Sequence, residues 1–194
     1  MMHHWAYSSI ALYEAVVSGM PSFQSLSGQL SDMPVMPGVE RNKAYHWPTC
    51  ANAVLAGMTR NFYLDSITQG GKDSIVLLEE SLNKLFKTEV GKAVFDRSQA
   101  FGKEIAARVF NWAITDGYIA THPAYIIPTG AGKWEKTPPG FLSPQRPYWG
   151  SNRPLMRGSV AASHLPAPPA YSSNATSSFY ASAKEVHDLR NNLS

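Results

Sequence analysis

Charged residues and cysteines are scarce in this chain of 194 residues, and long apolar runs are absent. Charged residues make up 16% of the sequence, against roughly 25% in an average soluble domain, and this share excludes charge-rich disorder. The single cysteine, Cys50, excludes an internal disulfide framework and a cysteine-rich zinc module. The longest apolar stretches, such as residues 75–78, fall far short of the ~18 residues that cross a bilayer, so we expect no membrane span.

The charge balance does not indicate a nucleic-acid partner. Seventeen Lys and Arg against fourteen Asp and Glu give a net charge of +3, and the basic residues are scattered along the chain. A small, dispersed excess of this kind does not indicate nucleic-acid binding. The first residues show no basic segment followed by an apolar run, so the chain itself carries no signal for secretion and leaves localisation unknown.

Helical periodicity dominates the first 116 residues. Small residues between 50 and 58 predict a helix that packs tightly against a neighbour. Asp73 or Ser74 can cap a further helix, whose apolar side chains recur at helical spacing and predict its core face. These apolar side chains are Ile75, Leu78, Leu82 and Leu85. Amphipathic helices are also predicted at about 3–18 and about 90–115, and Gly19 and Gly117 lie at their ends.

The composition changes after residue 116. Ten of the fourteen prolines lie in residues 117–177, where no period of 2 or 3.6 is evident. A loop of this length is uncommon unless it is functional, covers a helical body, or is held by other protein. A final amphipathic segment runs from about 178 to 189. We therefore predict an all-α bundle of four to five helices, with residues 1–116 as its body, 117–177 as an ordered Pro-rich arm, and 178–194 as the start of a further helix.

No catalytic arrangement is evident in the sequence. The six histidines lack the spacing of a zinc-binding helix, and no Gly-x-Ser-x-Gly turn presents a nucleophile. Gly130–Lys133 is followed by Trp134 and lacks the pattern of a phosphate-binding loop. We therefore predict no catalytic, cofactor-binding or metal-binding residue in this chain.

The aromatic and cationic residues of the arm are the candidate ligand contacts. A stacking platform for a sugar or a base needs such residues together, but the same residues can instead pin a long loop to the helices. Both interpretations stay open at this stage. The residues concerned are Trp134, Arg146, Tyr148, Trp149 and Arg153.

Three stretches together resemble one protein family. They are similar to bacterial vanadium-dependent haloperoxidase-like proteins of the type-2 phosphatidic acid phosphatase superfamily. The first looks like an early helix with the pattern A-Y-x-x-I-A-x-Y-E-A, the second like a central helix, and the third like an arm with W-x-x-T-P-P followed by P-x-W-G. In this sequence the stretches are residues 6–16, residues 101–117, and residues 134–141 with 147–150 and Arg153–Pro154.

The resemblance implies an α-helical enzyme that binds phosphate or vanadate. Such an enzyme hydrolyses phosphomonoesters or oxidises halides, and its signature is Lys-x6-Arg-Pro, then Ser-Gly-His, then Ser-Arg-x5-His. Lys and Arg would neutralise the oxyanion, while the histidines would attack or coordinate and transfer protons. None of the three blocks occurs here, because Arg146–Pro147 and Arg153–Pro154 lack the preceding lysine and Ser163–His164 lacks the glycine.

Two hypotheses follow. In the first, the chain is the non-catalytic N-terminal helical half of such an enzyme, and residues 178–194 lead into a C-terminal catalytic half. The chain itself would hold no cofactor, the parent would bind phosphate or vanadate, and the partner would be the missing half or a second copy. Of the two activities, acid-phosphatase-like hydrolysis is preferred, and the parent is expected to be exported. In the second, the chain is a stand-alone helical domain whose aromatic arm holds a glycan or a protein.

Overall fold

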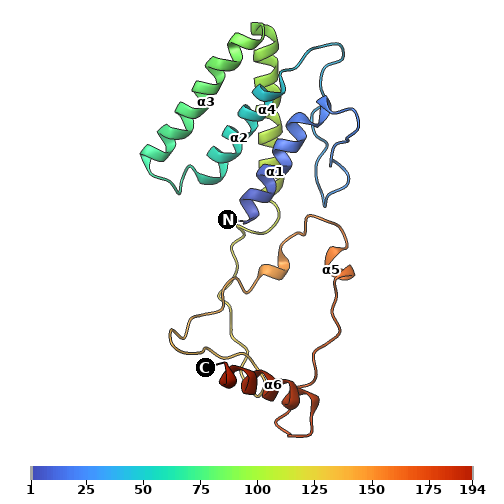
Figure 1. The fold of residues 1–194 in the computed structure, drawn as a ribbon, viewed down its shortest axis with the longest axis vertical. Helices are drawn as coiled ribbons and strands as arrows, with labels where there is room; N and C mark the ends of the chain where they lie inside the picture. The colour runs from blue at the N-terminus through green and yellow to red at the C-terminus, as the bar shows by residue number, and fades with distance from the viewer. Residues whose placement is uncertain (1, 194) are drawn as a thin grey trace. The chain divides into compact units, whose positions relative to one another are not determined.

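The structure, a computed structural model, describes residues 2–193, the side chain of Met2 excepted (Figure 1). The described residues contain helices and loops but no strand, so the predicted all-α class is confirmed. The chain divides into two compact units. The first comprises residues up to Ile119 together with Asn152–Arg157, and the second comprises Ala120–Ser151 and the residues from Gly158 onward.

The first unit is a bundle of four helices (Figure 1). Each corresponds to one of the helices predicted from the sequence. Their bounds are α1 at Met2–Val16, α2 at Trp47–Tyr63, α3 at Gln69–Glu89 and α4 at Lys92–Ala113, with a short 3-10 helix, η1, at Val17–Gly19. Across the described residues, none of the helices is both long and apolar enough to cross a bilayer.

The core lies where α1, α2 and α4 meet, and α2 and α4 approach each other closely. A Cβ atom added to Gly102 of α4 would lie 2.4 Å from the Cys50 carbonyl oxygen and 2.9 Å from the Ala53 Cβ. Gly57 of α2 also lies close to α4, because a Cβ there would lie 2.8 Å from the Ala106 Cβ. The small residues of α2 therefore permit close backbone approach, as the sequence predicted.

Helix α3 lies against α2 through polar side chains. The Asn52 side chain donates hydrogen bonds to the Asn83 side chain at 3.1 Å and to the Glu79 carbonyl oxygen at 3.2 Å. Arg60 of α2 forms an ion pair with the Glu79 carboxylate. The side of α3 that meets α2 therefore includes Glu79 and Asn83, which lie outside the apolar stripe predicted as its core face.

The predicted core face of α3 is wrong for this reason. The side chains of Leu78 and Leu85 are 62% and 53% exposed, and none of the residues of α3 is buried. The ion pair and the amide contacts turn the helix so that only one edge of its apolar stripe, at Ile75 and Leu82, is half-buried. Helical periodicity located the helix correctly but did not fix its rotation about its own axis.

The second unit contains long loops and little helix (Figure 1). The regular elements of this unit are a 3-10 helix, η2, at Trp149–Ser151, a short helix, α5, at Ser159–Ala162, and a longer helix, α6, at Ser178–Asn192. Helix α6 confirms the helical segment predicted at about 178–189. It begins where the Ser177 hydroxyl accepts a hydrogen bond from the Tyr180 amide at 3.1 Å.

Candidate functional site

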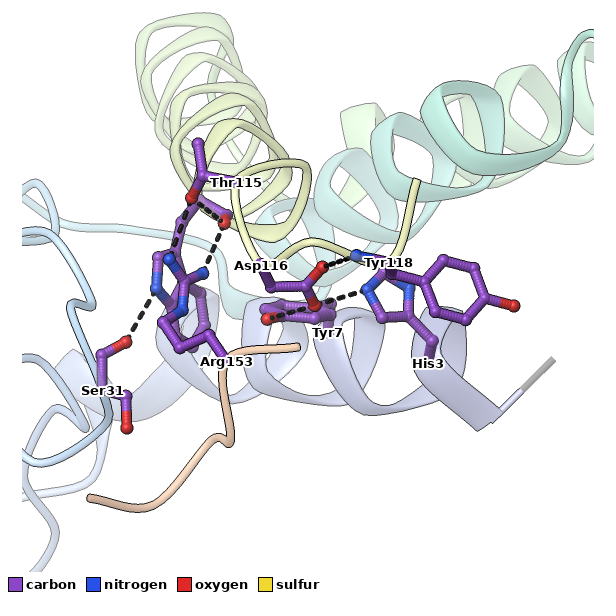
Figure 2. A network of polar contacts seen from close by, with 8 residues as sticks. His3, Tyr7, Ser31, Thr115, Asp116, Tyr118 and Arg153 are labelled. Atoms are coloured by element: carbon purple, nitrogen blue, oxygen red, sulfur yellow. Dashed lines mark hydrogen bonds and ion pairs between the residues drawn. The ribbon is translucent and has the colours of Figure 1, made fainter. Parts of the chain in front are cut away.

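A buried carboxylate lies just beyond the C-terminal end of α4 (Figure 2). Asp116 accepts hydrogen bonds on one oxygen from the His3 Nε2 atom at 2.7 Å and from the Tyr7 hydroxyl at 2.9 Å. Its other oxygen accepts a bond from the Tyr118 amide at 2.8 Å. These three donors compensate for the loss of water around a carboxylate that is only 5% exposed.

Burial also acts on the tyrosine of this cluster. Burial, together with the neighbouring Asp116 carboxylate, raises the pKa of Tyr7 to about 12. Tyr7 is therefore neutral at physiological pH and donates its proton to the carboxylate. His3 packs beside it, with its ring stacked on Tyr118 at a centroid distance of 4.1 Å.

Arg153 approaches the same helix end from far along the chain (Figure 2). Its guanidinium donates to the Trp112 carbonyl oxygen at 2.7 Å and to the Thr115 hydroxyl at 2.9 Å. It also lies over the Trp112 ring, 5.2 Å from the ring centroid. A cation is favourable there because the last carbonyl groups of a helix carry partial negative charge.

Backbone contacts join the same segments. The Arg153 amide donates to the Asp116 carbonyl oxygen at 2.7 Å, and the Ser31 amide donates to the Leu155 carbonyl oxygen at 2.9 Å. The Trp112 indole then donates to the Ser31 carbonyl oxygen at 3.0 Å. The residues at the end of α4 and those at 153–155 are thus held together, which closes the intervening loop at its base. We refer to this set of contacts as the Asp116–Arg153 clamp.

The clamp holds segments of the chain in place, and most of its polar groups are bound within the protein. Its one carboxylate is saturated by donors, and both terminal nitrogens of its guanidinium bind acceptors within the protein. A nucleophile activated by a free base is missing from this set of residues. Among the described residues, moreover, no group of three or more His, Cys, Asp or Glu side chains is arranged to bind a metal.

A hydroxyl, an imidazole and a carboxylate also line up at the start of α2. His46 contacts the Thr49 hydroxyl through Nδ1 at 2.8 Å and the Glu89 carboxylate through Nε2 at 3.0 Å. This order of groups is that of a nucleophile, a base and an orienting acid. Thr49 is completely buried, however, so no substrate reaches its hydroxyl. The arrangement instead connects α2 to the C-terminal end of α3.

The structure distributes the five predicted arm residues over separate places. Arg153 belongs to the clamp in the first unit, whereas the other four lie in the second unit. Tyr148 stacks on His122 at a centroid distance of 4.4 Å and donates to the Pro123 carbonyl oxygen at 3.1 Å. Trp134 lines a hollow between loops of the arm, and neither Arg146 nor Trp149 lines that hollow.

Sequence reasoning missed most of the clamp. It placed the end of the helix predicted at about 90–115 next to Asp116, considered His3 only among histidines that lack zinc-binding spacing, and gave Tyr7 no role outside the resemblance. Asp116 lies 113 and 109 positions away from these two partners, so no local spacing connects them. A signal was present only in the resemblance, whose motifs include Tyr7, Asp116 and Arg153.

One solved structure is similar to nearly the whole chain. The crystal structure of the first bacterial vanadium-dependent iodoperoxidase matches 98% of this chain with a TM-score of 0.76 and 28% sequence identity. The chain spans 44% of the length of that protein. No model of a protein family matches the chain, and no curated protein matches it. The similarity confirms the resemblance to vanadium haloperoxidases and supports a relationship to that family.

Proposed function

We propose that this chain is the non-catalytic N-terminal helical portion of a vanadium-haloperoxidase-like enzyme. The observation that carries the proposal is the unequal coverage: 98% of this chain matches only 44% of the iodoperoxidase. The sequence also lacks the three signature blocks that would supply an oxyanion site. Together these facts support the proposal that the catalytic residues of the parent enzyme lie outside residues 1–194.

The residues of the clamp do not fit vanadate or phosphate. An oxyanion site needs several cationic or N–H donors that point at one position. In the clamp, the terminal nitrogens of Arg153 are already bound to Trp112 and Thr115, and the Asp116 carboxylate at its centre would repel an anion. We therefore assign the clamp to the scaffold, where it fixes the base of the arm.

The exposed apolar face of α3 supports the proposal that a further part of the parent protein binds to this chain. Leu77, Leu78 and Leu85 are 66%, 62% and 53% exposed on this one helix. Apolar side chains gathered on one surface typically mark an interaction site. The iodoperoxidase is more than twice as long as the matched segment, so the catalytic portion is the occupant we assign to this face.

For the parent activity, we favour vanadate-dependent halide oxidation. The solved structure that this chain resembles is an iodoperoxidase, and this favours halide oxidation over the phosphomonoester hydrolysis preferred from the sequence. Which halide or other substrate the parent uses depends on residues of the catalytic portion. Export of the parent from the cytoplasm remains an expectation of the family resemblance.

The direct test is to read the coding sequence beyond codon 194. We expect the reading frame to continue and to encode Lys-x6-Arg-Pro, Ser-Gly-His and Ser-Arg-x5-His. The purified 194-residue chain should show no oxidation of iodide with orthovanadate and peroxide, and no hydrolysis of p-nitrophenyl phosphate. A frame that stops at codon 194, or a turnover that is lost when one side chain of this segment is mutated, would overturn the proposal.

The partner surface can be tested with the encoded downstream polypeptide. Co-expressed with this chain, it should co-purify, and Leu78→Ser combined with Leu85→Ser should weaken the complex. Leu165→Ser is the matched control, because Leu165 is 79% exposed but lies in the second unit. If the α3 variant and the control bind equally well, α3 is not the docking face.

A further inference from the structure

The arm contains a hollow that none of the preceding roles uses. It lies wholly within the second unit, between residues 125 and 147, and its volume is ≈ 640 Å³. Small-molecule sites typically measure about 300–1,000 Å³. The lining includes Tyr125, Trp134 and Leu142 together with five prolines. Prolines restrict the backbone, so these walls lose little conformational freedom when a ligand binds.

The turn at one side of the hollow is fixed by glycine. Gly132 has a φ of +73°, and a Cβ atom there would lie 2.5 Å from the Tyr171 ring. The turn is closed by a hydrogen bond from the Lys133 amide to the Gly130 carbonyl oxygen at 3.1 Å. Tyr171 in turn contacts the Phe179 ring of α6 at a centroid distance of 5.2 Å. This packing determines where Lys133 and Trp134 lie at the wall.

The charge of the lining is as informative as its apolar character. Among the described residues that line the hollow, Lys133 carries the one formal charge. The structure shows its ammonium group without a carboxylate partner among the described residues. Trp134 follows directly, and its ring offers a flat apolar surface that is 52% exposed. A cation beside an aromatic wall complements a flat ligand with one negative charge.

We propose that this hollow binds a small aromatic carboxylate or a similar aromatic monoanion. The ring of the ligand stacks on Trp134 between the proline walls, and its anionic group pairs with Lys133. The proposal is independent of the proposed function, because all the residues concerned lie in the second unit of this chain.

The test compares three ligands with the same ring system on the full chain. The anion 2-naphthoate, the neutral 2-naphthalenemethanol and the cation 2-naphthylmethylammonium are titrated by calorimetry and by saturation-transfer NMR. We expect 2-naphthoate to bind most tightly and the cation most weakly. Lys133→Gln should weaken binding of the anion about threefold, the size of a solvent-exposed ion pair, and should leave the alcohol unchanged. Lys136→Gln, which removes the same charge from a residue that does not line the hollow, should change nothing.

The contribution of the ring is tested separately. Trp134→Leu should weaken all three ligands about tenfold, a loss typical of one stacking contact. Trp149→Leu is the matched control, because Trp149 belongs to the same unit but does not line the hollow. Circular dichroism of each variant verifies that the arm and α6 remain folded.

Three outcomes would overturn the proposal. One is the absence of 2-naphthoate binding at millimolar concentration. Another is equal affinity for the anion and the cation. The third is an equal loss of affinity in a control variant, Lys136→Gln or Trp149→Leu, and in the corresponding variant of the hollow. The ligand would then bind elsewhere on the surface. Self-association of the chain that is weakened by Trp134→Leu, without ligand binding, would assign the hollow to a second copy instead.

Discussion

Replacing Arg153 tests whether the clamp stabilises the helical body. Arg153→Gln removes the charge, the two side-chain bonds to Trp112 and Thr115, and the contact with the indole ring. Hydrogen bonds to charged groups contribute about 1.5–3 kcal/mol each when buried, and an exposed cation–π contact about 0.5–1 kcal/mol. Because Arg153 is half-buried, solvent screening reduces this sum, and we expect a loss of about 2 kcal/mol in the free energy of unfolding.

Urea unfolding followed by tryptophan fluorescence measures this loss, since Trp112 lies at the clamp. The matched control is Arg157→Gln. Arg157 lies in the same segment, but its 3.8 Å ion pair with Asp32 joins side chains that are 69% and 70% exposed. We expect this variant to lose less than about 0.5 kcal/mol. Arg153→Lys should recover only part of the loss, because an ammonium lacks the planar fork that reaches two acceptors.

The clamp also predicts a local effect on the arm. Limited proteolysis should cut residues 120–151 faster in Arg153→Gln than in Arg157→Gln, because the base of that loop is then held only by backbone contacts. If the two variants unfold at the same urea concentration and are cut at the same rate, the guanidinium contacts contribute nothing measurable. The argument for a clamp would then be refuted.

Three further predictions concern the core. Gly102→Ala should lower the free energy of unfolding by about 2–3 kcal/mol, because the added Cβ would clash with the α2 backbone. Gly70 has open space around it, so Gly70→Ala should raise the free energy of unfolding by about 0.5 kcal/mol; thermal or urea unfolding measures both changes. The unfolded chain releases the Tyr7 proton near pH 10 and the folded chain near pH 12. The free energy of unfolding should therefore fall by about 2 kcal/mol between pH 10 and pH 12, and Tyr7→Phe should make this fall smaller. Cys50 is fully buried, and burial raises the pKa of its thiol to about 11. A thiol reagent at neutral pH should therefore label Cys50 only after unfolding, and rapid labelling of the folded chain would contradict this prediction.

The sequence predicted the helices of the bundle because their apolar and small residues recur at a local period. Gly57 and Gly102, for example, lie in the contact between α2 and α4 that their small size favours. The rotation of α3 was not predictable in this way, because two interpretations of its amphipathic pattern compete. One buries Leu78 and Leu85, and the other satisfies Glu79 against Arg60 of α2. Only the sequence of α2, a separate segment, decides between them.

The arm shows the same limit more strongly. Its prolines and aromatic residues predicted an ordered loop, but not which of its residues would contact which partner. Tyr148 contacts Pro123, 25 positions earlier, and the adjacent His122, whereas Arg153 binds the end of α4 about forty positions earlier. Contacts at such separations depend on the tertiary fold and have no periodic signature.

Residues from each of the three stretches that carry the family resemblance meet at one place in the structure. The early helix contributes Tyr7, the central helix contributes Trp112, Thr115 and Asp116, and the arm contributes Arg153 (Figure 2). Their contacts hold the end of α4, the start of α1 and the base of the arm together. Two buried atoms of this set, His3 Nδ1 and Arg153 Nε, have no hydrogen-bond partner among the described residues. Residues by which this chain resembles a vanadium haloperoxidase therefore take part in holding these segments together. This is the pattern expected if the segment positions a catalytic portion and carries out no reaction itself.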